Sequence, residues 1–259
     1  MPQPHPARRT VKRGLAFAAL AVAAAALCVR LGSWQWQRGR QSEAETVRFS
    51  RGSERLVDLG ARAVTDVPLY QRVRVQGELD GAHQFLLDNR TWRGRAGYEV
   101  LTPLRRRGGD ALLVDRGWVP FGGTRAALPE VGLAGAPPAT LTGRLALLPS
   151  AGLASGRAAP AAGASWPKVT SYPTTLELAA ALGAPLSSRI LLLDAGAPFG
   201  YVRDWQAPGL PALRHFAYAI QWWTFAALIV VLWGVMSLRR SLRRLLRLRR
   251  AARIEGARA

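Results

Sequence analysis

The sequence is poor in cysteine, lysine and histidine, and each shortage narrows the classes of protein to which it can belong. Its one cysteine, Cys28, allows neither a disulfide within the chain nor a Cys-x-x-Cys metal or redox site. A copper or zinc site built on several thiolates of one chain is excluded for the same reason. Three histidines, His5, His83 and His215, are available as metal ligands or catalytic bases.

The chain also lacks the short motifs of common enzyme classes. It contains no Gly-x-Gly-x-x-Gly, no P-loop, no His-Glu-x-x-His and no Gly-x-Ser-x-Gly. His83 precedes a predicted strand, and we interpret it as a turn histidine rather than as part of a triad with Asp115. We therefore expect a protein that is not an enzyme. A membrane-anchored hydrolase would need a catalytic cluster that the sequence does not offer.

Acidic residues are scarce relative to basic ones. The chain has 16 acidic and 36 basic residues, which gives a formal net charge of +20. Such a balance is typical of nucleic-acid-binding proteins, but the distribution of charge favours a membrane. Residues 1–13 carry four basic side chains and no acidic one, and residues 239–259 carry nine arginines and one acid. Basic ends beside apolar segments follow the positive-inside rule and suit anionic lipid headgroups. We expect both termini in the cytoplasm, a lipid bilayer as partner and no nucleic acid.

Two apolar segments are long enough to be membrane-spanning helices. Residues 216–238 are 23 residues without a charge, which at about 1.5 Å per residue gives roughly 34 Å of helix, against a hydrocarbon core of about 30 Å. Residues 14–36 are rich in alanine and end on Trp34 and Trp36, a residue type that anchors helices at membrane interfaces. A signal peptide cleaved after the alanines at 24–26 is the alternative for this first segment.

Between the apolar segments the hydrophobic pattern changes to a period of two, which predicts β-strands. In residues 72–79, Val73, Val75 and Leu79 share one face, and the opposite face is polar or charged. Further strands are predicted at 84–88, 98–104, 111–118, 140–147 and 189–194.

One short helix and one loop are predicted beside these strands. A capping box formed by Thr174 and Glu177 begins a helix that ends at Gly183. Residues 150–163 are rich in alanine, glycine and proline and are predicted to form a flexible loop. The predicted fold class is therefore membrane α plus β, with two transmembrane helices flanking an antiparallel β-rich periplasmic domain.

This organisation divides the chain into five segments. They are a cytoplasmic tail at 1–13, a transmembrane helix at 14–36, a periplasmic β-rich domain at 37–214, a second transmembrane helix at 215–238 and a basic cytoplasmic tail at 239–259. The first tail is predicted to be disordered, and the polar residues 39–69 to be a connector. Leucines recur among arginines over 239–250, which predicts an amphipathic helix lying on the inner membrane surface.

His215 begins the second span, and Tyr218 and Trp222 follow it on the same helical face. Two interpretations of His215 stay open: a structural histidine bonded to a loop or lipid headgroup, and an axial ligand of a haem iron. A helix N-terminus disfavours the charged imidazolium, and neutral imidazole is the form that binds iron. As a ligand, His215 would have Tyr218 and Trp222 beside the macrocycle. Gln221 is expected to hydrogen-bond across to Gln35 on the first helix.

The segment Arg116-Gly117-Trp118 also has two interpretations. In the first it is the end of a strand, where Gly117 permits an unusual backbone angle or a close approach, Trp118 packs in the core and Arg116 is paired locally. In the second it is a docking edge, since arginine and tryptophan are favoured at interface hot spots.

Three blocks of the sequence resemble the surfeit-locus-one family of cytochrome c oxidase assembly proteins, called Shy-type in yeast. Residues 31–38, Leu-Gly-Ser-Trp-Gln-Trp-Gln-Arg, are similar to the family's G-x-W-Q-x-x-R after the first span. A second block runs from Arg72 to the Arg-Gly-Trp-Val-Pro at 116–120, and the third is His-x-x-Tyr-Ala-x-Gln-Trp at 215–222. The resemblance covers nearly the whole chain, although Asp115 stands where asparagine is common in the family.

The resemblance implies an assembly factor of the bacterial inner membrane that serves haem–copper cytochrome c oxidase. It implies that the protein binds haem a, helps its insertion into oxidase subunit I and works beside haem a synthase. His215 would be the iron ligand, with Tyr218, Trp222 and Trp34 around the macrocycle. The residues expected to serve in interactions are Trp34, Gln35, Arg38, Arg116, Gly117, Trp118 and Gln221. The alternative is a scaffold that stabilises an oxidase intermediate without touching haem.

Overall fold

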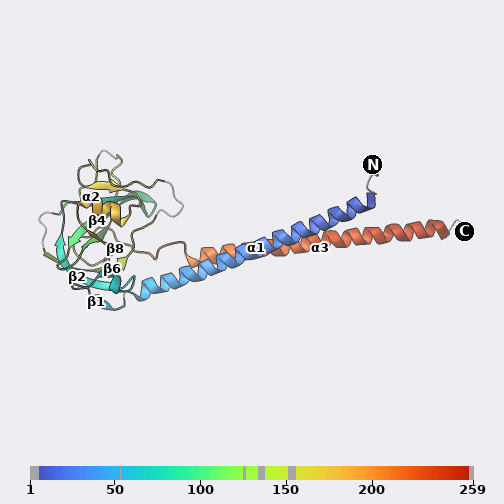
Figure 1. The fold of residues 1–259 in the computed structure, drawn as a ribbon, viewed down its shortest axis with the longest axis horizontal. Helices are drawn as coiled ribbons and strands as arrows, with labels where there is room; N and C mark the ends of the chain where they lie inside the picture. The colour runs from blue at the N-terminus through green and yellow to red at the C-terminus, as the bar shows by residue number, and fades with distance from the viewer. Residues whose placement is uncertain (1–5, 53, 125–126, 134–137, 151–155, 257–259) are drawn as a thin grey trace. The chain divides into compact units, whose positions relative to one another are not determined.

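The structure is a computed structural model, and it describes residues 6–52, 54–124, 127–133, 138–150 and 156–256. The chain divides into two compact units (Figure 1). The helical unit comprises Met1–Glu45 and Pro208–Ala259, and the sheet unit comprises Thr46–Ala207.

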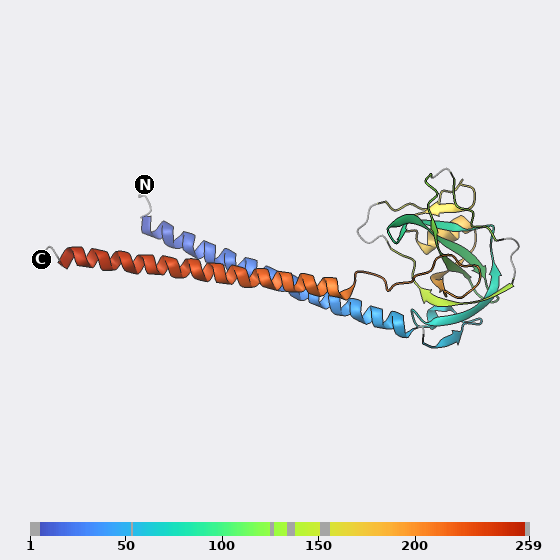
Figure 2. The ribbon, with the colours of Figure 1, turned by 180° about the vertical axis from the view of Figure 1, so that it is seen from behind.

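Two long helices, α1 (Pro6–Arg51) and α3 (Ala212–Gly256), run antiparallel and side by side in the helical unit (Figures 1 and 2). The guanidinium of Arg240 lies 5.5 Å from the centre of the Phe17 ring, so the first half of α1 lies beside the second half of α3. Both helices are long and apolar enough to cross a membrane. Little of either apolar stretch is buried inside the chain, which distinguishes them from the core helix of a soluble protein.

Both helices extend beyond the segments predicted for them. The prediction that residues 1–13 are disordered is wrong for residues 6–13, which are helical. Residues 1–5 lie outside the described part of the chain. The predicted connector is also helical as far as Arg51. The predicted surface helix over 239–250 is instead an uninterrupted continuation of α3. A change of polarity does not end a helix; breaking residues do, and residues 37–51 and 238–255 contain no proline and a single glycine, Gly39.

The sheet unit is built on eight strands in one sheet of order β1-β2-β6-β8-β5-β4-β3-β7. The strands are β1 (Leu56–Asp58), β2 (Arg72–Leu79), β3 (Phe85–Trp92), β4 (Arg95–Arg105), β5 (Ala111–Pro120), β6 (Pro138–Ala146), β7 (Lys168–Thr170) and β8 (Leu186–Leu193). A short 3-10 helix, η1 (Val64–Asp66), lies between β1 and β2. All the strands predicted from alternation are present.

The prediction of a purely antiparallel sheet is wrong, because the sheet is mixed. The pairs β1–β2, β3–β7 and β5–β8 are parallel, and the remaining pairs are antiparallel. Parallel neighbours need a long crossover, and β5 reaches β8 only after β6, β7 and the helix α2 (Thr175–Leu182). Apolar and polar residues alternate along a strand in the same way whether its neighbour is parallel or antiparallel. The sequence pattern therefore did not distinguish a mixed sheet from an antiparallel one.

Five strands close into a ring, because β2 pairs with β6 and also, at Glu78 and Leu79, with β4. Apolar side chains from all five strands fill one core cluster: Val73, Val75, Leu79, Leu104, Leu112, Val114, Leu141, Leu145, Leu191 and Leu193. The predicted inward face of residues 72–79 is therefore confirmed. Leu147, the last residue of the strand predicted at 140–147, is exposed because β6 ends at Ala146.

The helix α2 forms as the capping box predicts. The Thr174 hydroxyl accepts from the Glu177 N–H, the Glu177 carboxylate accepts from the Thr174 N–H, and Gly183 ends the helix. Leu178 of α2 packs in a second core cluster with Phe85, Leu101, Leu113 and Ile190. Within the predicted loop at 150–163, residues 151–155 lie outside the described part, and Ala158 pairs with Ser171 in an isolated bridge.

Candidate functional site

The helical unit brings His215 of α3 against Gln35 of α1. The Nδ1 atom of His215 lies 2.9 Å from the Oε1 atom of Gln35. An amide oxygen can only accept a hydrogen bond, so Nδ1 carries the proton. The neutral imidazole then presents the lone pair of Nε2, and within the described residues no group is hydrogen-bonded to that nitrogen.

This contact replaces the one expected from the sequence. Gln35 is the partner of His215, whereas Gln221, predicted to bond to Gln35, has an exposed side chain. His215 lies one turn into α3, and Gln221 lies almost two turns further along. The Gln35 side chain therefore meets the histidine at the start of α3 rather than the amide deeper in it.

Two glycines of α1 let aromatic side chains of α3 lie against its backbone. A Cβ atom on Gly32 would lie 2.5 Å from the indole ring of Trp223, and one on Gly39 would lie 2.5 Å from the Phe216 ring. Trp36 lies between these contacts, with its ring centre 4.7 Å from that of Phe216 and 5.7 Å from that of Trp223. This packing fixes the register of the two helices, and with it the meeting of Gln35 and His215.

A groove of about 390 Å³ lies beside His215 within the helical unit. Its lining comes from the polar part of α1, from the segment before α3 and from His215 itself: Arg38, Gln41, Ser42, Glu45, Pro208, Gly209, Leu210 and His215. The Ser42 hydroxyl donates to the Leu210 carbonyl at 2.6 Å, which holds the segment before α3 against α1. The prediction of a connector at residues 39–69 missed this groove. The signal for it is the helical spacing of the polar residues Gln35, Arg38, Ser42 and Glu45, which places them on one face of a helix.

The aromatic residues predicted around His215 do not line this groove. Tyr218 is 49% exposed and Trp34 is 51% exposed. Trp222 is half-buried and packs edge-on against Phe225 of its own helix, with ring centres 5.9 Å apart. Of the residues predicted for this site, the structure thus gathers His215, Gln35 and Arg38.

In the sheet unit, Arg116 is a buried structural residue with 3% exposure. Its Nε donates to the Phe199 carbonyl at 2.6 Å, and its Nη1 donates to Gln84 Oε1 at 2.7 Å and to the Val131 carbonyl at 3.0 Å. Its guanidinium also lies 4.8 Å from the centre of the Tyr201 ring. Burial lowers the pKa of Arg116, and Tyr201 partly offsets that effect. The arginine ties β5 to three separate chain segments.

Gly117 and Trp118 complete this arrangement. Gly117 has φ of +109°, and a Cβ atom there would lie 2.5 Å from the Val202 carbonyl oxygen. Trp118 is 7% exposed, and its indole N–H donates to the Arg90 carbonyl at 3.3 Å. These observations match the strand-end interpretation of the segment. A docking role for Arg116, Gly117 and Trp118 stays a prediction, and little of either large side chain is available to a partner.

Asp115, which is buried, and Glu99, which is half-buried, form an acidic pair on neighbouring strands. Burial, followed by the charge of Glu99, raises the pKa of Asp115 well above its usual range, although Asp115 accepts a hydrogen bond from the Gly117 N–H at 3.0 Å. Burial also raises the pKa of Glu99, and the ion pair with Arg90 at 3.0 Å acts against that rise. The hydrogen-bond partner of the Asp115 carboxylate is thus the backbone N–H of Gly117 on its own strand, rather than His83.

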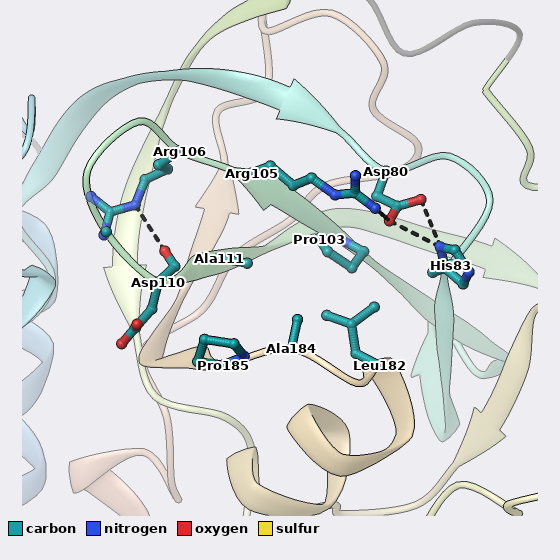
Figure 3. A pocket seen from close by; sticks show the side chains of 11 residues that line it. Asp80, His83, Pro103, Arg105, Arg106, Asp110, Ala111, Leu182, Ala184 and Pro185 are labelled. Atoms are coloured by element: carbon teal, nitrogen blue, oxygen red, sulfur yellow. Dashed lines mark hydrogen bonds and ion pairs between the residues drawn. The ribbon is translucent and has the colours of Figure 1, made fainter.

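His83 belongs to a second, smaller cavity of about 280 Å³ in the sheet unit (Figure 3). Its Nδ1 lies 2.9 Å from a carboxylate oxygen of Asp80, which also accepts from Arg105 at 2.6 Å. Burial tends to raise the pKa of Asp80, but the hydrogen bonds from His83 and Arg105 outweigh it, so the pKa lies below its usual value. Figure 3 shows Leu182, Ala184 and Pro185 on the opposite wall, so no nucleophile completes a triad among the labelled side chains.

Comparison with known proteins agrees with this structure. Two long apolar helices that bracket a mixed β-sheet unit are consistent with a membrane protein that carries one folded domain. The model of the SURF1 family matches residues 22–227, which include the Gln35–His215 contact and the whole sheet unit. The chain belongs to the SURF1 family, a family of assembly factors associated with cytochrome c oxidase. No curated protein matches the chain.

Proposed function

We propose that this chain is a haem a carrier in the assembly of haem–copper cytochrome c oxidase, with His215 as the iron ligand and oxidase subunit I as the recipient. The hydrogen bond between His215 Nδ1 and Gln35 Oε1 carries the proposal. A histidine that binds a metal through one nitrogen almost always donates its other N–H to an oxygen acceptor, which sets the tautomer and orients the ring. Gln35 supplies that acceptor and leaves Nε2 for iron.

The residues present fit an iron porphyrin better than a bare metal ion. Among the described residues, no group of three or more His, Cys, Asp and Glu side chains could hold a metal ion. A porphyrin supplies four nitrogen ligands itself, so one imidazole from the protein serves as an axial ligand. The groove beside His215 has a volume within the range of ligand sites, about 300–1,000 Å³. Haem a would be a cargo here, received from haem a synthase.

The charge pattern supports a location in the bacterial inner membrane. The antiparallel helices have basic residues at the start of α1 and at the end of α3, and such residues favour the cytoplasmic side. The sheet unit would then lie in the periplasm. Tyr218 and Trp34, each about half exposed, would be available at the helix surface to an amphiphilic ligand or to lipid.

The test measures oxidase assembly in cells that make haem a and lack their own copy of the gene. The wild-type chain, His215→Ala and the control Thr224→Ala are expressed, and haem a is measured per molecule of subunit I. Among the described residues, Thr224 hydrogen-bonds to the Ile220 carbonyl of its own helix at 2.9 Å, so the control should match wild type. A carrier predicts a severalfold lower ratio for His215→Ala. A scaffold that does not touch haem predicts an unchanged ratio.

A further inference from the structure

A polar stripe on α1 continues from the His215 contact along the groove. The stripe consists of Gln35, Arg38, Gln41, Ser42 and Glu45, spaced three or four residues apart or adjacent. Residues at that spacing lie on one face of a helix. All of them except Gln35 line the groove, and Gln35 holds the histidine at its end. The groove therefore has the His215 imidazole at one end and a charged wall beside it.

Arg38 is the cationic residue of this stripe, and it lies close to the His215 end. It lies one turn after Gln35, and its Nη1 donates to the neutral Gln41 Oε1 at 3.2 Å. Within the described residues no carboxylate pairs with Arg38, whereas Glu45 lies two turns further along, about 10 Å at 1.5 Å per residue. An anion in the groove is thus attracted to the Arg38 end, which also adjoins the positive first turn of α3.

Resting on the proposed function, we propose that Arg38 pairs with a propionate carboxylate of haem a bound at His215. An axial bond from one nitrogen fixes the iron but leaves the macrocycle free to rotate about that bond. A guanidinium at the wall of the same groove would fix the rotation, because it can hold a carboxylate through two parallel hydrogen bonds. Arg38 is therefore assigned as a positioning residue that orients the cargo in the groove.

The experiment compares haem a with its dimethyl ester, in which both carboxylates are blocked. Absorbance titrations of the full chain in detergent give the dissociation constants for wild type, Arg38→Gln, Arg38→Lys and the control Arg40→Gln. Arg40 is exposed, lies two residues away on α1 and does not line the groove. We expect wild type and Arg40→Gln to bind haem a about five- to tenfold more tightly than the ester, as suits a partly solvated charged pair.

For Arg38→Gln we expect haem a and the ester to bind equally, each with the affinity that wild type shows for the ester. Arg38→Lys should retain part of the preference, since it keeps the charge without the planar fork. If Arg38→Gln prefers haem a over the ester as strongly as wild type does, the assignment of Arg38 is overturned, while His215 remains the ligand. If Arg38→Gln loses the same factor in affinity for haem a and for the ester, the assignment is also overturned, and Arg38 acts through contact with lipid or with Gln41. Wild type that binds neither compound would remove the proposed function itself.

Discussion

Gln35 of the first helix accepts a hydrogen bond from Nδ1 of His215 on the last helix, across 2.9 Å. The two residues are 180 positions apart, and the contact selects the imidazole tautomer whose Nε2 is available to a metal. A residue of α1 thus controls the chemistry of the candidate ligand on α3.

Replacing Gln35 should therefore weaken haem binding without abolishing it. Gln35→Leu removes the acceptor, and loss of such a partner typically costs 10- to 100-fold in metal affinity, so we expect about a tenfold weaker affinity for haem a. Gln35→Glu keeps an acceptor and should bind at least as well as wild type. Absorbance titration with haem a measures both. Unchanged binding by Gln35→Leu would contradict the orienting role of this bond.

Gly32 should be needed for the packing of the two helices. Gly32→Ala places a methyl group where the Trp223 ring lies, and overpacking of this kind typically costs about 1–3 kcal/mol. The control is Gly14→Ala, because a Cβ atom there would meet nothing within 4 Å. Thermal unfolding followed by far-UV circular dichroism in detergent should show a lower Tm for Gly32→Ala only. Equal melting of both variants would show that α1 and α3 do not depend on this contact.

Arg116 should affect stability rather than docking. Arg116→Ala removes the buried guanidinium that donates to the Phe199 carbonyl, the Val131 carbonyl and Gln84 Oε1, so we expect a loss of about 2–4 kcal/mol in the free energy of unfolding. The exposed Arg107→Ala is the control. Denaturant unfolding followed by tryptophan fluorescence measures the loss. If Arg116→Ala is as stable as wild type but assembles less oxidase, the docking interpretation is the better one.

Asp115→Asn should stabilise the chain at neutral pH. The pKa of Asp115 is raised in the folded state. The contribution of this group to the stability of the fold is therefore fully present below its unfolded-state pKa of about 3.9, and it is lost as the pH rises through its folded-state pKa. Asparagine removes the buried charge and keeps an oxygen for the Gly117 N–H. We expect Tm at pH 7 to rise by a few degrees, about 1 kcal/mol in a chain of this size, and the gain to shrink towards pH 4.

The matched control for this prediction is Asp110→Asn, since Asp110 is exposed on the turn before β5. It should change Tm little at either pH. A lower Tm for Asp115→Asn at pH 7 would mean that the folded state needs the ionised carboxylate.

Much of the secondary structure could be predicted from the sequence, because it depends on local patterns. The 23 uncharged residues at 216–238 predicted α3, alternation around Val73 and Val75 predicted β2, and the Thr174–Glu177 capping box predicted α2. The closure of five strands and the parallel pairs depend on contacts between distant segments, which a single strand's pattern does not contain.

The candidate site shows the same limit. His215 and Arg38 could be singled out from their positions beside apolar segments and from the family resemblance. The Gln35–His215 bond depends on the register of two helices, which is set by aromatic rings lying on Gly32 and Gly39. The register decides whether Gln35 meets His215 or Gln221, which lie almost two turns apart on α3, and the sequence pattern allowed either.

The most direct test of the central claim is an absorption spectrum of the detergent-purified chain made in cells that synthesise haem a. The wild-type chain should carry haem a, Thr224→Ala should match it, and His215→Ala should lose the haem a bands. A colourless wild-type chain from cells that contain haem a would contradict the carrier function. A haem a spectrum that persists in His215→Ala would contradict the assignment of His215 as the ligand.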